Sequence, residues 1–227
     1  MSGKLYIVST PIGNLQDITS RAITVLSTVE IIACEDTRVT RKLLNFYNIK
    51  NKLITYNDFN SLKMSEKIVD ILEEGQNVAL VSDAGTPCIS DPGYRLVNRA
   101  HLKKIEVVSI PGASSVHSAL SISGLPSDAY FFQGFLPKKK GRKTKFDFLK
   151  SLECSIIIFE SPKRLKKTLS DIYINMGNRV ISICKEISKI YETVYLDKAK
   201  NLIEFFSEVN PKGEYVIVIS KEGYKLK

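Results

Sequence analysis

The chain has 227 residues, of which 44% are hydrophobic and 25% are charged, as in an ordinary globular protein. No apolar stretch approaches the roughly 20 residues that span a bilayer. The short apolar run near the start leads straight into a turn, which is not the pattern of a signal peptide. We therefore expect a cytoplasmic protein with no membrane partner.

The formal net charge of +9 lies mostly in the second half of the chain. Residues 1–117 hold 13 basic and 12 acidic side chains, whereas residues 118–227 hold 20 and 12. Six basic residues lie within 138–145 around a glycine, which favours a mobile loop over a helix face. Such a run is either a solvated surface or an arm that contacts a polyanion, because each neutralised phosphate releases counterions.

The first half of the chain alternates short apolar strands with amphipathic helices. The predicted strands are 4–10, 30–35, 52–56, 77–82 and 104–110. The predicted helices are 18–29, capped by Thr19 or Ser20, then 40–48, then 64–75, and one that starts at Asp91 (N-cap) and Pro92. Continuous Val/Ile runs separated by helices are typical of a parallel sheet covered on both faces.

The second half has a different order of elements. The predicted strands are 129–137, 154–161, 179–187, 191–196 and 214–220, and the predicted helices are 145–152 and 161–177. Only residues 188–190 separate two of these strands, which suits a hairpin and excludes a helical crossover. The sequence therefore predicts an α/β fold of two domains, with a parallel sheet in residues 1–117 and a mixed sheet in residues 118–227.

No metal site is expected. A zinc site needs clustered ligands, but the cysteines are far apart in the sequence and form no C-x-x-C pair. These residues are Cys34, Cys88, Cys154 and Cys184, and the histidines are His101 and His117. We expect reduced, mostly buried thiols.

Elaborate turns follow four of the five predicted strands of the first domain: TPIGNLQDIT, CEDTR, SDAGTPCISDPG and PGASS. Ligands of open parallel sheets bind outside the carboxyl ends of the strands, so these turns predict one ligand cleft. No dinucleotide or P-loop motif occurs. Acidic Gly/Pro turns suit a ligand with hydroxyls, amino groups and positive charge, such as S-adenosylmethionine. Asp83 and Asp91 are candidates to face it, with a helix cap as the other role for Asp91.

Seven motifs occur in order along nearly the whole chain: YIVSTPIGNLQDITSRA, CEDTR, ALVSDAGTPCISDPGY, IPGASS, GFLP, FESPKRL and KEISKIYE. Together they resemble the tetrapyrrole methylase superfamily, and within it the 16S rRNA (cytidine-2'-O)-methyltransferases. The resemblance implies methyl transfer from S-adenosylmethionine to a cytidine ribose in the decoding centre of the small ribosomal subunit. It also implies a homodimer whose cofactor cleft lies between the two domains of each chain.

The resemblance further implies which residues contact the cofactor, many of them through the backbone. From the N-terminal turns these are Pro11, Asp83, Ala84, Gly85, Ser90, Asp91, Ser114 and Ser115. From the second domain they are Phe159, Glu160, Ser161, Glu186, Gly213 and Glu214.

A ribose hydroxyl is a poor nucleophile at neutral pH and needs a base or electrostatic help. The candidates are Glu186 and Lys189, with Lys189 neutral if burial and nearby cations lower its pKa. The alternative is an ordinary ion pair. Glu35, Asp36 and Arg38 are expected at the substrate, with Arg38 on the RNA backbone or at a dimer contact. A helix cap is the alternative role for Asp36.

The basic residues expected to contact RNA are Lys138, Lys139, Lys140, Arg142 and Lys143. A small tetrapyrrole would not need such a run of cations, whereas rRNA would. Two other functions stay open, a methyltransferase acting on a tetrapyrrole and a non-catalytic RNA-binding assembly factor. The turn TPIGNL argues against the first, because small-molecule members tend to a Gly-rich turn ending in Asp-Pro.

Overall fold

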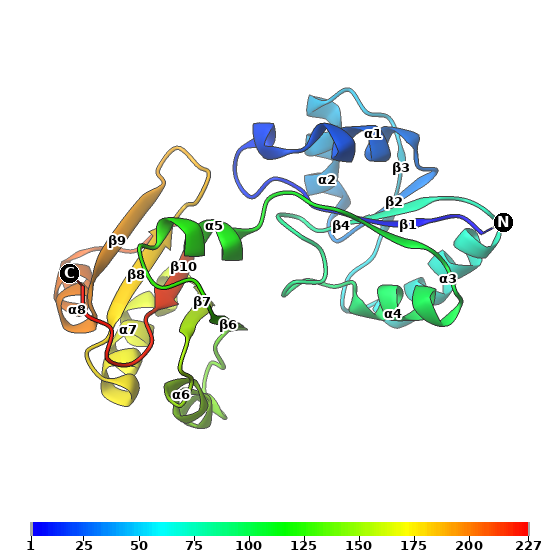
Figure 1. Ribbon diagram of the computed structural model, residues 1–227. Helices are drawn as coiled ribbons and strands as arrows, with labels where there is room; N and C mark the ends of the chain where they lie inside the picture. The colour runs from blue at the N-terminus through cyan, green and yellow to red at the C-terminus, as the bar shows by residue number, and fades with distance from the viewer. Residues whose placement is uncertain (1, 227) are drawn as a thin grey trace. The chain divides into compact units, whose positions relative to one another are not determined.

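The computed structural model describes residues 2–226, and two compact units divide between Ser114 and Ser115. The first unit is built on a five-stranded sheet in the order β3-β2-β4-β1-β5 (Figure 1). Its strands are Leu5–Val8 (β1), Ile31–Cys34 (β2), Lys52–Thr55 (β3), Val78–Val81 (β4) and Val107–Ile110 (β5). All pairings are parallel, which confirms the sheet type predicted for the first half.

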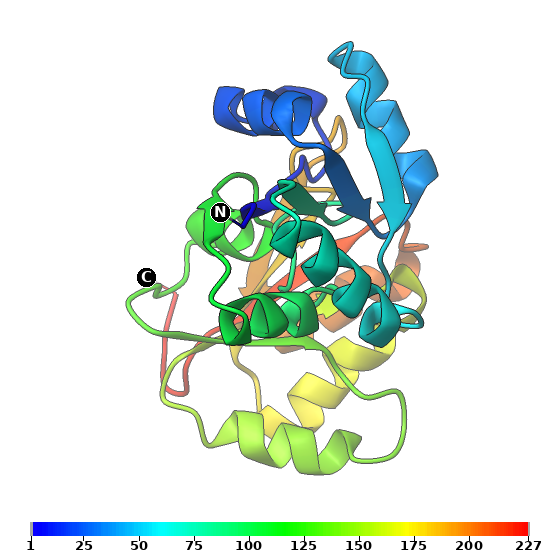
Figure 2. The same cartoon turned by 90° about the vertical axis from the view of Figure 1, so that its right-hand side faces the viewer.

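Helices cover both faces of this sheet. They are Leu15–Asp17 (η1, a 3-10 turn), Ser20–Thr28 (α1), Thr37–Phe46 (α2), Ser61–Glu73 (α3) and Tyr94–Leu102 (α4). In β4, Val78 and Leu80 pack with apolar residues of α3 and α4, whereas Ala79 and Val81 pack with those of α1 and α2. Figure 2 shows α3 and α4 side by side on their face of the sheet.

The second unit holds a five-stranded sheet in the order β6-β7-β10-β8-β9. Its strands are Tyr130–Phe135 (β6), Ser155–Glu160 (β7), Val180–Lys185 (β8), Thr193–Lys198 (β9) and Tyr215–Ile219 (β10). The β6–β7 pair is parallel and the other pairs are antiparallel. This arrangement confirms the predicted mixed sheet and the predicted antiparallel pairing of β8 with β9.

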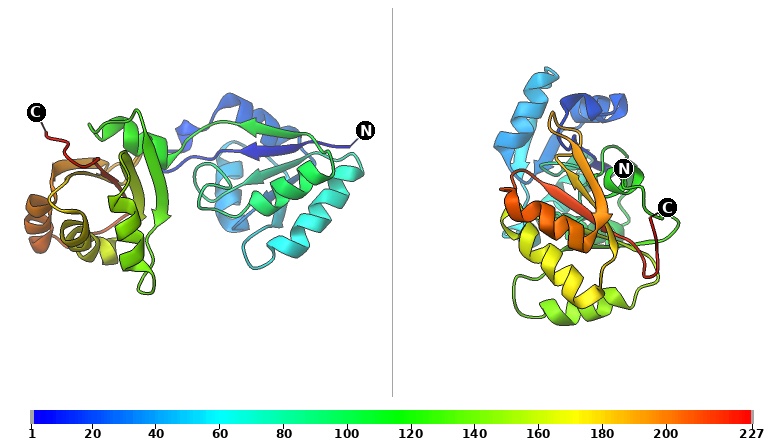
Figure 3. Two further views of the ribbon diagram at one scale, coloured as in Figure 1. Left: turned by 60° about the horizontal axis from the view of Figure 1, so that its bottom comes forward. Right: turned by 90° about the vertical axis from the view of Figure 1, so that its left-hand side faces the viewer.

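The helices of the second unit are Ser115–Ile122 (α5), Arg142–Lys150 (α6), Pro162–Met176 (α7) and Ala199–Glu208 (α8). Helices α6, α7 and α8 lie in a row in the right panel of Figure 3. Leu149, Leu169 and Phe206 from these helices are buried in one core. Burial of such a side chain stabilises the fold by about 1.5–3 kcal/mol. Within residues 2–226, none of the helices has the length and apolar composition that a bilayer crossing requires.

Some element boundaries differ from the sequence-based expectations. Helix α4 begins at Tyr94 after Gly93, whose φ is 152°, so the prediction that Asp91 caps this helix was wrong. A Cβ atom at Gly93 would lie 2.4 Å from Cys88 Sγ, so the turn accepts only glycine there. Helix α6 begins at Arg142, so half of the basic run is helical and not a loop. No sequence-based element corresponds to α8.

Candidate functional site

Three turns at the carboxyl edge of the parallel sheet are tied together by hydrogen bonds. Thr10, next to Pro11, exchanges backbone hydrogen bonds with Gly85 at N···O distances of 2.9 and 3.0 Å. The Thr86 hydroxyl lies 3.0 Å from Ser9 Oγ and donates to the Ala113 carbonyl. The turns after β1, β4 and β5 therefore form one connected edge, which includes the segment from Asp83 to Gly85 and ends at Ser114.

The turn after β4 also holds unusual backbone conformations. Cys88 and Ser90 have φ of 72° and 61°, and such positive values are uncommon for residues other than glycine. The Ser82 hydroxyl donates to the Gly85 carbonyl at 3.2 Å and fixes the start of this turn. Strained backbone of this kind clusters at ligand sites because the surrounding structure must enforce it. The conformation fits the cofactor turn expected from the sequence.

The turn after β2 joins the same edge through Asp83. The Asp36 backbone N–H donates to Asp83 Oδ1 at 3.1 Å. The Asp36 carboxylate itself caps α2 by accepting from the Arg38 backbone N–H at 2.8 Å, and it also pairs with the Arg38 guanidinium at 2.6 Å. These hydrogen bonds with Arg38 lower the pKa of Asp36 to about 2. Asp36 thus has the cap role that the sequence left open.

A pocket of about 410 Å³ lies at this edge of the first unit. It is lined by Glu35, Asp36, Thr37, Arg38, Thr55, Asn57, Asp58, Phe59 and Asp83. The structure brings together the residues expected at the substrate and adds the turn after β3, which the sequence analysis did not single out. An available signal was the sequence TYNDFN, an Asn/Asp-rich turn directly after a strand of the same sheet.

Burial and neighbouring carboxylates raise the pKa of several carboxyl groups in and beside this pocket. Burial raises the pKa of Glu35, and the charges of Asp83, Asp91, Asp58 and Asp36 raise it further. Burial is also the first cause of the raised pKa of Asp83 and of Asp91. Carboxyl groups with raised pKa values are common at ligand sites, because a bound ligand can supply the compensating charge that the protein does not.

We expect Glu35→Gln to raise the melting temperature at pH 7. A carboxyl group with a raised folded-state pKa costs stability when ionised, and this cost disappears as pH falls through that pKa toward the unfolded value. The gain should therefore shrink on acidification, and it should not exceed about 4 °C, the shift for roughly 1 kcal/mol in a chain of this size. Thermal unfolding between pH 4 and 8 measures it.

The control for this prediction is Glu204→Gln, which neutralises an exposed carboxylate on α8. It should change the melting temperature little at any of these pH values. A loss of stability in Glu35→Gln at pH 7 would contradict the cost of burying the Glu35 charge among other carboxylates.

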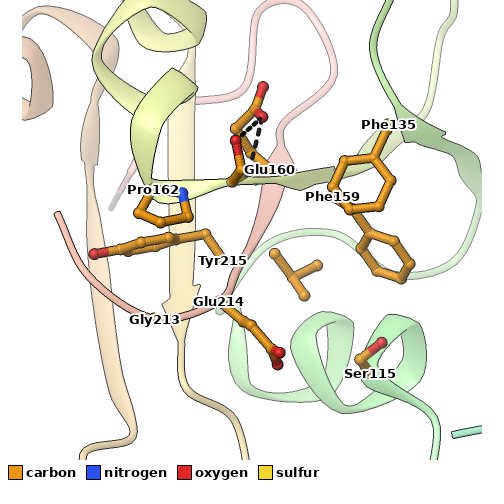
Figure 4. A pocket seen from close by; sticks show the side chains of 10 residues that line it. Ser115, Phe135, Phe159, Glu160, Pro162, Gly213, Glu214 and Tyr215 are labelled. Carbon is orange, nitrogen blue, oxygen red and sulfur yellow. Dashed lines mark hydrogen bonds between the residues drawn. The ribbon is translucent and has the colours of Figure 1, made fainter. Parts of the chain in front are cut away.

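The second unit has its own pocket, of about 340 Å³, where β7 and β10 meet the first residues of α5 and α7 (Figure 4). It is lined by Ser115, Phe135, Phe159, Glu160, Ser161, Pro162, Gly213, Glu214, Tyr215 and Val216. Six of these residues are among those the sequence resemblance assigns to the cofactor. The rings of Phe135 and Phe159 pack edge to face with centroids 5.6 Å apart. Phe135 was missed, although it lies in the GFLP motif.

Glu160 lines this pocket, but its carboxylate is committed to the protein. It is 2% exposed and accepts from the Ser161 N–H at 2.8 Å, Arg164 Nε at 2.7 Å and Thr168 Oγ1 at 2.6 Å. Ser161 is the N-cap of α7 and Pro162 follows at the first helical position, as predicted. Glu160 therefore offers a ligand its main chain and not its side chain.

Glu186 and Lys189 form an ion pair beside the pocket. Lys189 Nζ lies 3.0 Å from Glu186 Oε1 and 2.8 Å from Glu214 Oε2, and the Glu214 N–H donates to Glu186 Oε1 at 2.8 Å. Burial alone would lower the pKa of Lys189, but hydrogen bonds to Glu214 and Glu186 raise it overall. These ion pairs favour the ammonium form of Lys189 and so argue against the neutral base considered from the sequence. Burial opposes ionisation of Glu186, yet the Glu214 N–H and Lys189 lower its pKa overall.

The expected RNA-contacting residues divide into two groups. Lys138, Lys139, Lys140 and Lys143 are exposed. Arg142 is only 7% exposed, because its guanidinium donates to Asp171, Pro137 O and Thr168 inside the unit. The expectation that Arg142 contacts RNA is corrected, because these hydrogen bonds hold its guanidinium inside the unit.

Residues 4–203 match the family described as Tetrapyrrole (Corrin/Porphyrin) Methylases. The chain is 45% identical to Ribosomal RNA small subunit methyltransferase I of Halalkalibacterium halodurans, over 99% of this chain and 78% of that protein. It is also 45% identical to the protein of that name from Thermotoga maritima, over 96% of this chain and 98% of that protein.

Two solved structures share the fold. Diphthine synthase has a TM-score of 0.77 at 13% identity, over 98% of this chain and 92% of the other. A cobalt precorrin-4 methyltransferase has a TM-score of 0.69 at 18% identity, over 96% and 94%. At these identities the matches show the two-domain α/β fold and not a shared substrate.

Proposed function

Because the chain belongs to the tetrapyrrole methylase family, we propose that it methylates the RNA of the small ribosomal subunit with S-adenosylmethionine as donor. The observation that carries the proposal is the 45% identity, along nearly the whole chain, to proteins named for that activity. More finely, we propose that the methyl group is transferred to the 2'-hydroxyl of a cytidine in the decoding centre of 16S rRNA. That target rests on the sequence resemblance.

The residues at the two pockets fit S-adenosylmethionine. In the second unit, Phe159, Val216 and the Gly213–Glu214 backbone suit an adenine and a ribose, within a volume ordinary for a small-molecule site. In the first unit, the acidic turn with Asp83 and Asp91 suits a cationic ligand end, whose charge would relieve the mutual repulsion of the carboxylates.

When bound, S-adenosylmethionine supplies a methyl group on a sulfonium, and the protein must align it with the attacking oxygen. Alignment alone can contribute roughly 7–11 kcal/mol at best. Because its ion pairs favour the ammonium form of Lys189, we assign Lys189 and Glu186 to holding the Gly213–Glu214 wall of the pocket and placing a positive charge beside it. Glu35 and Arg38 are assigned to the substrate, together with Lys138, Lys139, Lys140 and Lys143, while Asp36 caps α2 and pairs with Arg38.

The test uses small ribosomal subunits from cells that lack this protein. They are incubated with the purified protein and labelled S-adenosylmethionine, and the product is mapped by nuclease digestion and mass spectrometry. Label on one cytidine ribose is the expected result. Cofactor binding without label on subunits or on naked rRNA would instead favour a tetrapyrrole substrate or a non-catalytic assembly factor.

Arg38→Ala should weaken RNA binding a few-fold and leave the affinity for S-adenosylmethionine unchanged. The Arg38 side chain is 87% exposed, so it can reach a phosphate. Loss of one phosphate contact reduces the salt slope of RNA binding by about 1. Filter binding of rRNA at several salt concentrations measures the slope, and calorimetry measures the cofactor affinity.

The matched control is Arg99→Ala, which removes a partly exposed arginine of the first unit, paired with Glu66 between α4 and α3. It should leave the salt slope of RNA binding unchanged. Equal losses of RNA and cofactor affinity in Arg38→Ala would reject the substrate role of Arg38.

A homodimer and a cytoplasmic location complete the proposal. The dimer is implied by the resemblance and is supported by exposed apolar residues at the β8–β9 hairpin, where Ile190 is 94% and Tyr191 75% exposed. Light scattering of the purified protein decides the oligomeric state. The location follows from the proposed substrate, since ribosomal subunits occupy that compartment in bacteria.

A further inference from the structure

A largely buried polar network connects the pocket of the second unit with the start of the basic run, with Arg164 and Asp171 at its partly exposed edge. Its first part is the Glu160 carboxylate, which accepts from Thr168 and from Arg164. Thr168 in turn accepts from Arg142 Nη2 at 2.8 Å, and Arg142 Nε pairs with Asp171 at 2.7 Å. Two arginines and two carboxylates thus neutralise one another inside the unit.

Both arginines also hold the chain just before Lys138. Arg164 Nη1 donates to the Leu136 carbonyl at 3.1 Å, and Arg142 Nη1 donates to the Pro137 carbonyl at 3.0 Å. The Arg142 N–H closes the far side of the turn on the Lys139 carbonyl at 3.2 Å. The segment with the exposed Lys138, Lys139 and Lys140 is therefore held at both of its ends.

A network of this kind is not the simplest way to stabilise a core. Buried ion pairs lose hydration, and well-packed apolar residues often replace them without loss of stability. The two guanidinium groups instead add directional hydrogen bonds. Each planar guanidinium donates well to a backbone carbonyl in only one position. The network is thus suited to fixing the conformation of the turn.

We propose that Arg142 and Arg164 are positioning residues that present Lys138–Lys140 to the RNA. This inference rests on the proposed function. The arginines make no contact with RNA themselves, and they act by holding the Leu136 and Pro137 carbonyls. RNA binding then costs less conformational entropy, because the three ammonium groups are already held in place and no loose protein arm has to be ordered.

The experiment is a double-mutant cycle on rRNA binding. Its variants are Arg142→Lys, which keeps the charge but cannot reach all three partners, the triple variant Lys138→Ala/Lys139→Ala/Lys140→Ala, and their combination. In the protein that keeps the three lysines, Arg142→Lys should lower RNA affinity by at least about threefold. A change of this size is within the interaction free energies found for residues of one hydrogen-bond network. The substitution should also reduce the salt slope. In the triple variant, Arg142→Lys should change neither.

The matched control is Arg179→Lys. Arg179 is equally buried in the same unit, at 6% exposed, and donates to Met176 O, Ser220 O and Lys150 O away from the turn. Its effect on RNA affinity should be the same with or without the three lysines. If Arg142→Lys does not fold, Arg164→Lys replaces it, because the Arg164 side chain is 23% exposed, lysine keeps its charge, and Arg164 holds the neighbouring Leu136 carbonyl.

The outcomes separate the two proposals. Equal effects of Arg142→Lys in both backgrounds, with RNA binding intact in the parent protein, would overturn the positioning role and leave the proposed function standing. Absence of salt-dependent rRNA binding in the parent protein would overturn both.

Discussion

Gly213→Ala is expected to lower the affinity for S-adenosylmethionine more than tenfold, which corresponds to about 1.4 kcal/mol or more. Gly213 has a φ of 90°, and an added Cβ would lie 2.6 Å from the Glu186 carboxyl carbon. That carboxylate cannot move away freely, because Lys189 and the Glu214 N–H hold it. The substitution must therefore displace the Gly213–Glu214 wall of the pocket. Calorimetric titration of the variant measures the loss.

The control is Gly177→Ala in the same unit. Gly177 has a φ of 84°, but a Cβ there would have no atom within 4 Å. Both variants share the backbone strain, about 1–3 kcal/mol for such a conformation, and only Gly213→Ala adds the collision. Gly177→Ala should lose thermal stability and keep its cofactor affinity. If Gly213→Ala bound the cofactor as tightly as the parent protein, the pocket would not be the cofactor site.

The triple substitution of Lys138, Lys139 and Lys140 by alanine is expected to have the largest effect on RNA binding. All three are exposed on one short turn. Each phosphate contact contributes about 0.7–0.9 to the slope of log affinity against log salt, so the slope should fall by about 2–3. Affinity near physiological salt should fall by at least tenfold, with the cofactor affinity unchanged. Filter binding across a salt series gives both quantities.

A variant with the same loss of charge elsewhere is the control: Lys167→Ala, Lys200→Ala and Lys221→Ala. These lysines are exposed on α7, on α8 and after β10. Net charge alone should affect steering of the RNA only weakly. An identical change of slope in both triple variants would mean that the RNA responds to overall charge and not to the turn.

The sequence by itself determined the architecture of each half. Strands of continuous Val and Ile must be buried on both faces, so the first half could form only a covered parallel sheet. The short link between β8 and β9 leaves no room for a crossover, so the second sheet had to be mixed. Local chemistry also located the start of α7, since Ser161 followed by Pro162 is a signal within a few residues. The motifs further indicated the family.

Only the tertiary structure decided what the charged side chains do. A run of basic residues does not show which members face inward, and Arg142 turned inward because Asp171, Thr168 and the Pro137 carbonyl lie there. In the same way, Lys189 pairs with Glu214, 25 residues away in the sequence, and this contact favours its charged form. Asp91 is not the cap of α4 because Gly93 changes the direction of the chain. Such roles depend on partners distant in sequence, and the ionisation and burial of a side chain follow from those partners.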